Sequence, residues 1–301
     1  MNKIIIKNDT CRKCRLCVEV CPNKVLQVNK DNTVYPDGSR LTVCFACCQC
    51  MAVCPTRSIN VNGLSYQNDF YELPIEQVED KDFYNLILTR RSIRNYKNKA
   101  VKKEILEKIV EAISLAPIGF PPIKYKLVVV ENSEIIRKAL PEMIKLYDSL
   151  YNAINDPIKR QFVKHNAGKH KYKIMQEHLI PLLKIRLPNL KNGTEDTITR
   201  NAQAMILFVS DKKENISADI YVAATYGILF AHSIKLGASI MEIIPPAINK
   251  RKELRNMFKV KEDEEVITSI ILGYPKHNYQ RGIKRTIKNV FWINGDVLTR
   301  T

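Results

Sequence analysis

The chain has 301 residues, of which 45% are hydrophobic and 26% are charged, a composition typical of globular domains. No apolar run approaches the roughly 20 residues needed to span a bilayer, and the apolar start is too short for a signal peptide, so we expect a cytoplasmic protein with no membrane partner. The formal net charge of +17 would suit nucleic acid, but the lysines are spread along the chain without a recognition motif, so we expect no nucleic-acid partner.

All nine cysteines lie between Cys11 and Cys54, in two blocks that repeat after 33 residues. The first block is Cys11, Cys14, Cys17 and Cys21, followed by Pro22; the second is Cys44, Cys47, Cys50 and Cys54, followed by Pro55. Each block precedes a short stretch with strand-forming residues, 25–28 and 58–61. The repeat predicts a separate domain over residues 1–64, in which each unit is a ligand loop, a turn of helix and a strand.

The spacing of these cysteines favours iron–sulfur chemistry. Three cysteines at i, i+3 and i+6 can wrap one loop around three corners of a 4Fe-4S cluster, and the fourth thiolate must then come from elsewhere. Zinc binding and a disulfide scaffold are the alternatives, but zinc rarely uses this spacing followed by proline, and nothing in the sequence indicates secretion. Cys48 fits neither block, and we expect it to act as a small buried hydrophobic residue.

Both blocks match the run C-x-x-C-x-x-C-x-x-x-C-P, and residues 1–64 resemble a bacterial two-cluster ferredoxin. In such ferredoxins the fourth cysteine of each run ligates the cluster of the other run. The resemblance therefore implies two 4Fe-4S clusters. One would be held by Cys11, Cys14, Cys17 and Cys54, and the other by Cys21, Cys44, Cys47 and Cys50.

Residues 65–82 are polar and rich in turn formers, and they are predicted to be a linker to a second domain over 83–301. In that domain, hydrophobic periodicity predicts a helix over 102–115, a strand over 126–131, a long basic stretch over 133–184, a strand over 204–210, a helix over 218–236 and a strand over 266–272. Helices that alternate with strands indicate an α/β or α+β domain built on a sheet.

An arginine-rich segment follows the apolar stretch 83–88. It contains Arg90, Arg91, Ser92 and Arg94. Guanidinium groups and a hydroxyl at such close spacing can surround a phosphate with charge-assisted hydrogen bonds. A solvated basic helix end would look the same, so the segment alone leaves both interpretations open.

From about residue 83 to 301 the sequence resembles the nitroreductase family of FMN enzymes. The matching elements are the segment 90–94, Ala116-Pro117 before an apolar strand, the run 223–227 that leads to Leu236-Gly237, and Leu272-Gly273-Tyr274-Pro275 followed by Arg281 and Arg285. The resemblance implies an α+β chain, in which a small two-cluster ferredoxin domain precedes a nitroreductase-like α+β sandwich domain. It also implies an obligate homodimer, with each flavin at the interface between subunits.

The resemblance further implies which residues contact FMN. The phosphate and ribityl chain would be bound by Arg90, Arg91, Ser92 and Arg94, with Arg285 and Arg281 closing on the phosphate. The loop 242–244, which contains Ile243 and Ile244, would lie by the flavin ring and donate a backbone N–H to it. One departure is the segment 118–123, which reads Ile-Gly-Phe-Pro-Pro-Ile where many members carry Asn and Gln-Pro-Trp, so this wall would be more apolar.

The fusion of these two domains predicts an iron–sulfur flavoprotein oxidoreductase. Two clusters would relay electrons to FMN, and FMN to a small acceptor such as a nitroaromatic or a quinone. An acidic electron-carrier protein would suit the basic chain as donor. The alternative is an electron-transfer or redox-sensing module that passes electrons to a protein partner without turning over a small molecule. No catalytic side chain is identifiable from the sequence.

Overall fold

The computed structural model describes residues 4–75, 78–117, 119, 124–214, 218–294 and 297–300. The chain divides into two compact units, Met1–Val78 and Glu79–Thr301. One hydrophobic core lies in the first unit and two lie in the second. Within the described ranges, no helix is both long and apolar enough to cross a membrane.

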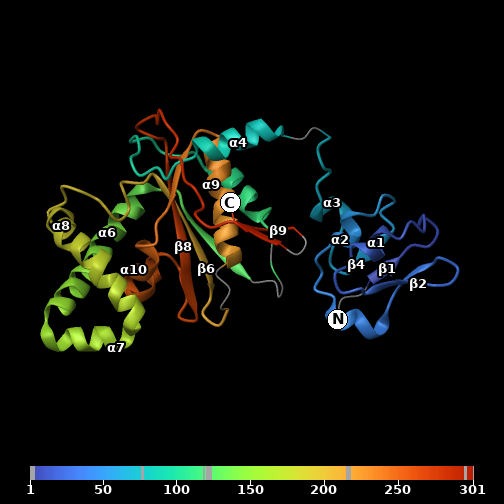
Figure 1. Ribbon diagram of the computed structural model, residues 1–301, viewed down its shortest axis with the longest axis horizontal. Helices are drawn as coiled ribbons and strands as arrows, with labels where there is room; N and C mark the ends of the chain where they lie inside the picture. Colours follow the sequence, from blue (N-terminus) through green and yellow to red (C-terminus); the bar gives the residue numbers. More distant parts are fainter. Residues whose placement is uncertain are drawn as a thin grey trace. The chain divides into compact units, whose positions relative to one another are not determined.

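The first unit consists of short elements around the cysteine blocks (Figure 1). In chain order they are β1 (Ile4–Ile6), α1 (Leu16–Glu19), β2 (Leu26–Val28), β3 (Val34–Pro36), a 3-10 helix (Gly38–Val43), α2 (Gln49–Ala52), β4 (Ile59–Val61) and α3 (Tyr66–Asp69). β1 pairs with β4, and β2 with β3, both antiparallel. Leu26 and Met51 are completely buried between them. The predicted strands at 25–28 and 58–61 are thus found as β2 and β4.

The sequence repeat is also a repeat of backbone conformation. Residues with positive φ recur 33 positions apart, as Lys13 and Ala46, Arg15 and Cys48, and Lys24 and Arg57. Arg15 and Cys48 immediately precede α1 and α2, with φ of 66° and 65°. The Cys48 thiol is only partly buried and donates a hydrogen bond to the Ala46 carbonyl at 2.9 Å. Cys48 is therefore the counterpart of Arg15 and not the buried hydrophobic residue that was expected.

Part of the predicted linker belongs to the first unit. The Ser65 hydroxyl accepts a hydrogen bond from the Asn68 N–H at 3.2 Å, and the Ser65 N–H donates to the Asp69 carboxylate at 2.7 Å. This reciprocal capping starts α3, and Tyr66 and Phe70 then pack against the first core. α4 (Asp80–Thr89) also begins before the predicted end of the linker. The linker prediction over 65–82 is therefore wrong at both ends.

The second unit is an antiparallel sheet with helices on both faces (Figure 1). After α4 its elements are α5 (Lys103–Ser114), β5 (Tyr125–Val130), α6 (Ser133–Asn155), α7 (Pro157–Ile174), a π-helical turn (Met175–Leu179), α8 (Ile180–Lys191), β6 (Ala204–Asp211), α9 (Ala218–Ser233), β7 (Gly237–Ile240), α10 (Ile244–Lys250), α11 (Lys252–Met257), β8 (Glu264–Gly273), β9 (Phe291–Asn294) and β10 (Val297–Arg300). The main sheet has the order β5-β6-β8-β7, and β9 pairs with β10. The fold is of the α+β class, as expected.

Alternating side chains of β6 supply both cores of this unit. Ala204, Ile206 and Phe208 pack with α5 and α9, whereas Met205, Leu207 and Val209 pack with α6, α8, α10 and α11. This alternation follows from the two-residue period of a strand, and both faces are covered because both are apolar. The predicted strands over 126–131, 204–210 and 266–272 correspond to β5, β6 and β8, and the predicted helices to α5 and α9.

α9 ends three residues earlier than predicted. Lys235 adopts the left-handed conformation, with φ of 64°, and the Leu236 N–H donates back to the Ala231 carbonyl at 2.8 Å. This is a common way to end a helix, although the left-handed residue is more often glycine. The chain then turns directly into β7.

An extended segment between α4 and α5 is bound to the sheet at β7 and at the end of β8. Ser92 pairs in parallel with Ala238, and the Ile93 N–H donates to the Ala238 carbonyl at 3.1 Å. Farther along, the Lys97 N–H donates to the Tyr274 carbonyl at 2.8 Å. The arginine-rich segment 90–94 is thereby held at a defined place on the sheet.

Two glycines permit this close approach. A Cβ at Gly237 would come within 2.6 Å of the Ile93 side chain, and one at Gly273 within 2.7 Å of the Tyr96 ring. These glycines belong to the sequence elements Leu236-Gly237 and Leu272-Gly273, which supported the family resemblance. Their role here is to let the segment 92–97 lie against the sheet.

Gly237→Ala is expected to destabilise the second unit by about 1–3 kcal/mol, because the added methyl group overlaps a buried side chain. Urea unfolding of the full chain, followed by a signal from the second unit, measures the change. Gly38→Ala is the control, since nothing lies within 4 Å of a Cβ there. Equal and negligible changes in the two variants would show that segment 92–97 can move aside.

Candidate functional site

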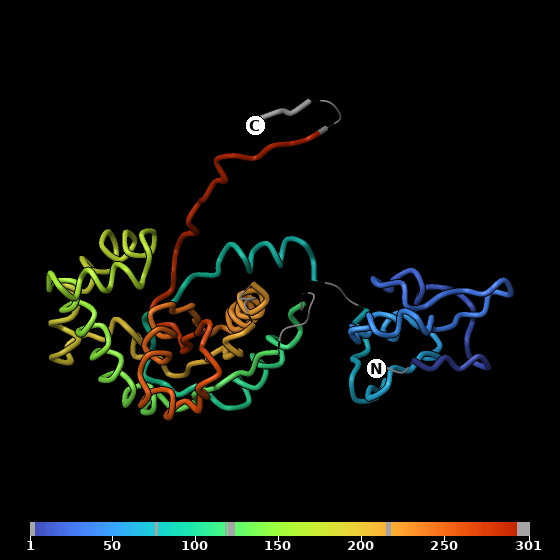
Figure 2. Tube along the Cα trace, turned by 90° about the horizontal axis from the view of Figure 1, so that it is seen from below, coloured from blue at the N-terminus to red at the C-terminus, as the bar shows by residue number. Residues whose placement is uncertain are grey.

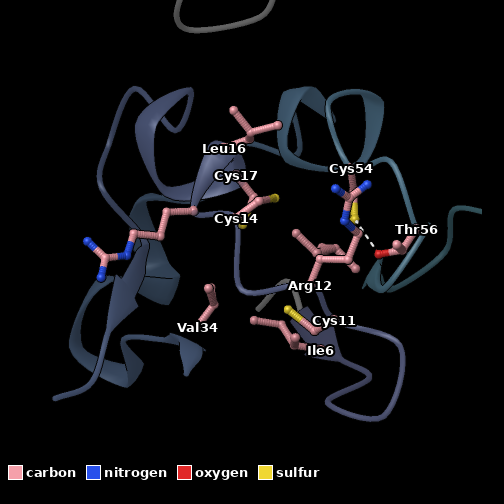
Figure 3. Close-up of a pocket in the computed structure, with 11 residues that line it drawn as sticks. Ile6, Cys11, Arg12, Cys14, Leu16, Cys17, Val34, Cys54 and Thr56 are labelled. Carbon is pink, nitrogen blue, oxygen red and sulfur yellow. Dashed lines mark hydrogen bonds between the residues drawn. The ribbon is translucent and has the colours of Figure 1, made fainter. Parts of the chain in front are cut away.

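Four cysteines from both blocks line a cavity in the first unit (Figure 3). Cys11, Cys14 and Cys17 reach it from the first loop, and Cys54 from just after α2. The remaining wall is mostly aliphatic, with Arg12, Arg15 and Thr56 as its polar members. The cavity comprises about 330 Å³ of space free of protein atoms, counted out to its mouth. We call it the first cavity.

The second cavity is built in the same way with the blocks exchanged. Cys44, Cys47 and Cys50 line it from the second loop, and Cys21 from just after α1. It has the same size, about 330 Å³, and its other lining is apolar apart from the Cys48 thiol. The structure thus brings the eight cysteines together in two sets, each with three members from one block and one from the other. In the part of the chain that the structure describes, no three His, Cys, Asp or Glu side chains converge on a single-ion site.

Each fourth cysteine accepts a hydrogen bond from a backbone N–H four residues later. The Val25 N–H donates to Cys21 Sγ and the Ser58 N–H to Cys54 Sγ, both at 3.3 Å. Burial, followed by the nearby sulfurs, raises the pKa of Cys17 to about 11 and that of Cys50 to about 12. Crowded thiols of this kind are poor thiolates by themselves, but a bound iron cluster would supply the positive charge that they lack.

Tyr66 of α3 adds a buried donor beside the cysteines. Its hydroxyl is buried close to Cys54 and to the Ile59 backbone, and it forms no hydrogen bond of standard geometry among the residues described. Burial and then the charge of Cys54 raise the pKa of Tyr66 to about 12, so the hydroxyl keeps its proton at neutral pH. A buried O–H next to cysteine sulfurs is placed to donate a hydrogen bond to the sulfur of a bound cluster or of its ligands. Sequence reasoning missed Tyr66 because it lies in the predicted linker, although the Ser65–Asp69 capping pattern could have revealed the helix.

In the second unit, the arginine-rich segment meets the chain that follows β8. Burial, followed by the positive charges of Arg91 and Arg285, lowers the pKa of Arg90. Arg91 donates to the Arg90 carbonyl at 2.5 Å, while its Nε is buried without a partner in the described chain. A Cβ at Gly282 would lie 2.8 Å from Arg91, which places the C-terminal segment directly beside this group. We call Arg90, Arg91 and Arg285 the arginine cluster; its close positive charges and unused donor suit an anion such as phosphate.

The other predicted phosphate contacts, Ser92, Arg94 and Arg281, are not part of the arginine cluster. Ser92 is held against Ala238, and Arg94 lies near Arg200, whose pKa is lowered by burial and then by Arg186 and Arg94. The Arg200 Nε is likewise buried and unpartnered in the described part. Sequence reasoning missed Arg200 because no motif marks it. Arg281 is exposed, and among the described residues no hydrogen bond or ion pair joins it to the arginine cluster.

The loop at 242–244 follows β7 at the start of α10. Ile244 is buried and its N–H donates to the Met241 carbonyl at 3.2 Å, so it has no N–H to offer a ligand. Ile243 is half-buried, and its carbonyl accepts from the Tyr147 hydroxyl. The Glu242 carboxylate is held by Thr268 at 2.6 Å and Tyr221 at 2.9 Å. Of the two predicted flavin-ring residues, Ile243 is therefore the better placed.

The apolar departure at 118–123 falls mostly outside the described residues, because Ile118 and 120–123 are not among them. Gly119 is described, and its N–H donates to the Asp219 carboxylate at 2.6 Å. Asp219 lies in the first turn of α9, so Gly119 is joined to the helix that covers one face of the sheet.

His232 lies beside the arginine cluster and is expected to give the FMN-free protein a pH-dependent stability. Its Nε2 lies 3.0 Å from the Thr89 hydroxyl, and burial, followed by Arg90 and Arg91, lowers its pKa below 6.5. Since the unfolded chain then binds this proton more readily, the free energy of unfolding should fall as pH drops below about 6.5. His232→Gln should weaken that fall, as urea titrations between about pH 7.5 and 5.5 can measure. Parallel pH profiles for wild type and variant would contradict this role.

Comparison with known proteins assigns the family. The sequence model of the Nitroreductase family matches residues 87–274, and a model described as a 4Fe-4S binding domain matches residues 4–27. The first match covers more than half of the chain, so the protein belongs to the nitroreductase family. It is a nitroreductase-family oxidoreductase that carries an N-terminal ferredoxin-type 4Fe-4S domain.

The relatives are distant. A candidate NADH dehydrogenase/NAD(P)H nitroreductase of Methanothermobacter thermautotrophicus is 24% identical over 207 residues, which cover 67% of this chain and 82% of the relative. The iodotyrosine deiodinase of Hydra vulgaris is 22% identical over 225 residues, which cover 71% of this chain and 73% of the relative. Both matches span more than two thirds of the relative.

Two solved structures share the fold. FMN-bound nitroreductases of Bacteroides fragilis and Desulfitobacterium hafniense each superpose with a TM-score of 0.51 and 18% identity, covering 71% of this chain. Those superpositions cover 99% and 98% of the respective solved chains. At this identity the likeness establishes the nitroreductase fold of the second unit.

Proposed function

We propose that the protein is an electron-relay oxidoreductase, in which two 4Fe-4S clusters in the first unit supply electrons to FMN in the second. The observation that carries the proposal is the coexistence of two four-cysteine cavities and the arginine cluster in one chain. Covalent fusion raises the concentration of clusters around the flavin far above that of separate proteins.

For the clusters, the proposed ligands are the cysteines that line each cavity. Cys11, Cys14, Cys17 and Cys54 would hold one cluster, and Cys21, Cys44, Cys47 and Cys50 the other. Soft thiolates suit iron–sulfur clusters, and the backbone donors to Cys21 and Cys54 would stabilise the charge on their sulfurs. The two cavities support two clusters, because they have equal size and equivalent cysteine sets.

For FMN, the proposed phosphate ligands are the members of the arginine cluster, with Ser92 and Arg94 toward the ribityl chain. The unpartnered Arg91 Nε and the mutual repulsion at Arg90 support this assignment, since an anion would relieve both. The Ile243 N–H has no acceptor among the described residues, which supports it as the donor to the flavin ring. When bound, FMN accepts and returns electrons singly or in pairs, and the protein positions and shields it.

A homodimer is the proposed assembly. α4 has no buried side chain, and its Phe83, Tyr84, Ile87 and Leu88 are each about half exposed or more. After β8 the chain runs out from the body of the second unit (Figure 2), with Ile283 and Ile287 64% and 82% exposed. Apolar side chains that are left uncovered on a single copy support burial against a second copy.

The proposed acceptor is a small oxidant such as a nitroaromatic or a quinone, and the proposed donor is an acidic electron-carrier protein. Names of the matched nitroreductases support the acceptor class. Exposed Arg12, Lys13 and Arg15 around the first cavity support an acidic donor by charge complementarity.

Anaerobic purification with iron, sulfide and flavin analysis tests the cofactors, and steady-state turnover tests the reaction. We expect about eight iron atoms and one FMN per chain, and consumption of a nitroaromatic or quinone when reduced ferredoxin is supplied. Full cofactor content without turnover of any small acceptor would instead indicate a module that passes electrons to a protein. Zinc in place of iron would contradict the proposal.

A further inference from the structure

The two cysteine loops share their positive-φ positions but differ in charge, since the first is cationic and the second is neutral. The first loop carries Arg12, Lys13 and Arg15; their counterparts 33 residues later are Phe45, Ala46 and Cys48, none of which is charged. Arg12 lines the first cavity (Figure 3), as does Arg15, whereas no charged side chain lines the second. Lys24 and Arg57 occupy equivalent positions in the two halves and line neither cavity; Arg57 is ion-paired with Glu72, and Lys24 donates to the Glu19 carbonyl at 3.2 Å.

These cations are only partly neutralised. Arg15 binds the neutral amide of Asn32, and Lys13 donates to the Asp31 carbonyl at 3.3 Å. Within the described ranges neither Arg12 nor Arg15 forms an ion pair with a carboxylate. Near the second loop, by contrast, Arg40 is paired with Asp37 at 3.5 Å. The first cavity therefore has the more positive surroundings.

Hydrogen bonds to the fourth cysteine also differ between the two cavities, and they too favour a negative charge at the first. The Thr56 hydroxyl lies 3.8 Å from Cys54 Sγ and 2.7 Å from the Ser58 hydroxyl, which lies 2.9 Å from the Thr10 hydroxyl. Ser58 is fully buried and can donate to Thr56, which leaves the Thr56 proton for the Cys54 thiolate. In the other half, the counterpart of Thr56 is Asn23, which donates to the Val43 carbonyl at 2.7 Å instead of to Cys21. The counterpart of Ser58 is Val25, which has no hydroxyl.

Solvent exposure of the ligand cysteines does not distinguish the two sites, because Cys14 and Cys47 are both exposed and the others are half-buried or buried. Reduction adds one electron, and hence one negative charge, to a cluster and its thiolates. Positive charge nearby and hydrogen bonds to sulfur both favour the more negative state.

We infer that the two clusters are not equivalent: the cluster of Cys11, Cys14, Cys17 and Cys54 has the higher reduction potential and takes up the first electron. The inference rests on the proposed two-cluster function. Arg12, Thr56 and Ser58 are then positioning residues that set this potential. The second cluster, in its apolar cavity, is the stronger reductant, so the chain holds one electron at moderate and one at low potential.

Anaerobic potentiometric titration with electron paramagnetic resonance detection tests the inference on the full-length holoprotein. We expect two separate reduction steps. At the potential that half-reduces the first cluster, less than about a tenth of the second should be reduced, which corresponds to midpoints at least about 59 mV apart.

Variants assign the two steps to the two sites. Arg12→Gln should lower only the upper midpoint, changing the ratio of reduced to oxidised cluster at fixed potential by about fivefold, and Arg12→Lys should retain it. Thr56→Val should also lower the upper midpoint, whereas Asn23→Ala, its repeat-related control, should move neither step. Ala46→Lys, which copies Lys13 into a position with the same positive φ, should raise the lower midpoint.

The outcomes separate the two proposals. Iron and sulfide analysis of each variant precedes the titration, and fewer than two clusters per wild-type chain would overturn the proposed function itself. With two clusters present, a single unresolved step, or a response of the lower step to Arg12→Gln and Thr56→Val, would overturn the assignment of the higher potential to the first cavity.

Discussion

Cys54→Ser is expected to reduce the iron content from about eight to about four atoms per chain. Cys54 is the fourth cysteine of the first cavity, and a serine oxygen is a harder and poorer ligand for an iron–sulfur cluster than a thiolate. Cys54 does not line the second cavity, so the cluster in that cavity should remain. Iron and sulfide analysis of anaerobically purified protein measures the loss.

Paired substitutions test whether the blocks exchange their fourth ligands. Cys11→Ser combined with Cys54→Ser should still leave about four iron atoms, because both residues serve one cluster, whereas Cys44→Ser combined with Cys54→Ser should leave almost none. Cys48→Ser is the matched control and should retain both clusters, since Cys48 belongs to neither set of four. The reverse pattern in the two double variants would place Cys54 at the second cluster.

Arg90→Ala and Arg285→Ala are each expected to weaken FMN binding by about 10-fold to 100-fold. Each variant removes a charge-assisted hydrogen bond to the phosphate, and such bonds contribute about 1.5–3 kcal/mol. The two residues come from opposite ends of the second unit and meet only in the folded chain, where Arg285 helps to lower the pKa of Arg90. Fluorescence titration of the flavin-free protein with FMN measures the affinity.

The control for these variants is Arg137→Ala, which removes an equal charge from α6. Arg137 lies with Lys145 and Lys191 in a surface groove and not in the arginine cluster. If Arg137→Ala weakens FMN binding as much as Arg90→Ala does, general charge and not the arginine cluster would account for the affinity. Loss of salt dependence in Arg90→Ala and Arg285→Ala, but not in the control, would support direct phosphate contact.

The cysteine ligands and the central strands could be predicted, because cluster binding and burial each require a particular pattern of residues in the sequence. Four thiolates around a cluster impose a cysteine spacing, and the repeat of that spacing carries the resemblance to a two-cluster ferredoxin that implies the two sets of four ligands. The strands β5, β6 and β8 were predictable because they are apolar over most of their length. Both faces of β6 are apolar, so the run 204–209 must lie in a sheet that is covered on both sides.

Other parts depend on contacts between distant segments. β7 is only four residues long, and its place at the sheet edge follows from pairing with β8. Arg200 is brought near Arg94 by the fold, and Tyr66 is buried beside Cys54 because α3 packs back on the first core. Apart from the Ser65–Asp69 capping pattern, which indicates α3 but not the contact of Tyr66 with Cys54, no spacing in the sequence marks these residues.

Single-turnover oxidation most directly tests the relay from clusters to flavin. The protein is reduced anaerobically, excess reductant is removed, and a nitroaromatic is added while cluster and flavin absorbance are followed. The account predicts that clusters in wild type are reoxidised through the flavin, that they stay reduced in the flavin-free Arg90→Ala/Arg285→Ala variant, and that saturating FMN restores their oxidation. Clusters that are reoxidised equally fast without flavin would contradict the relay.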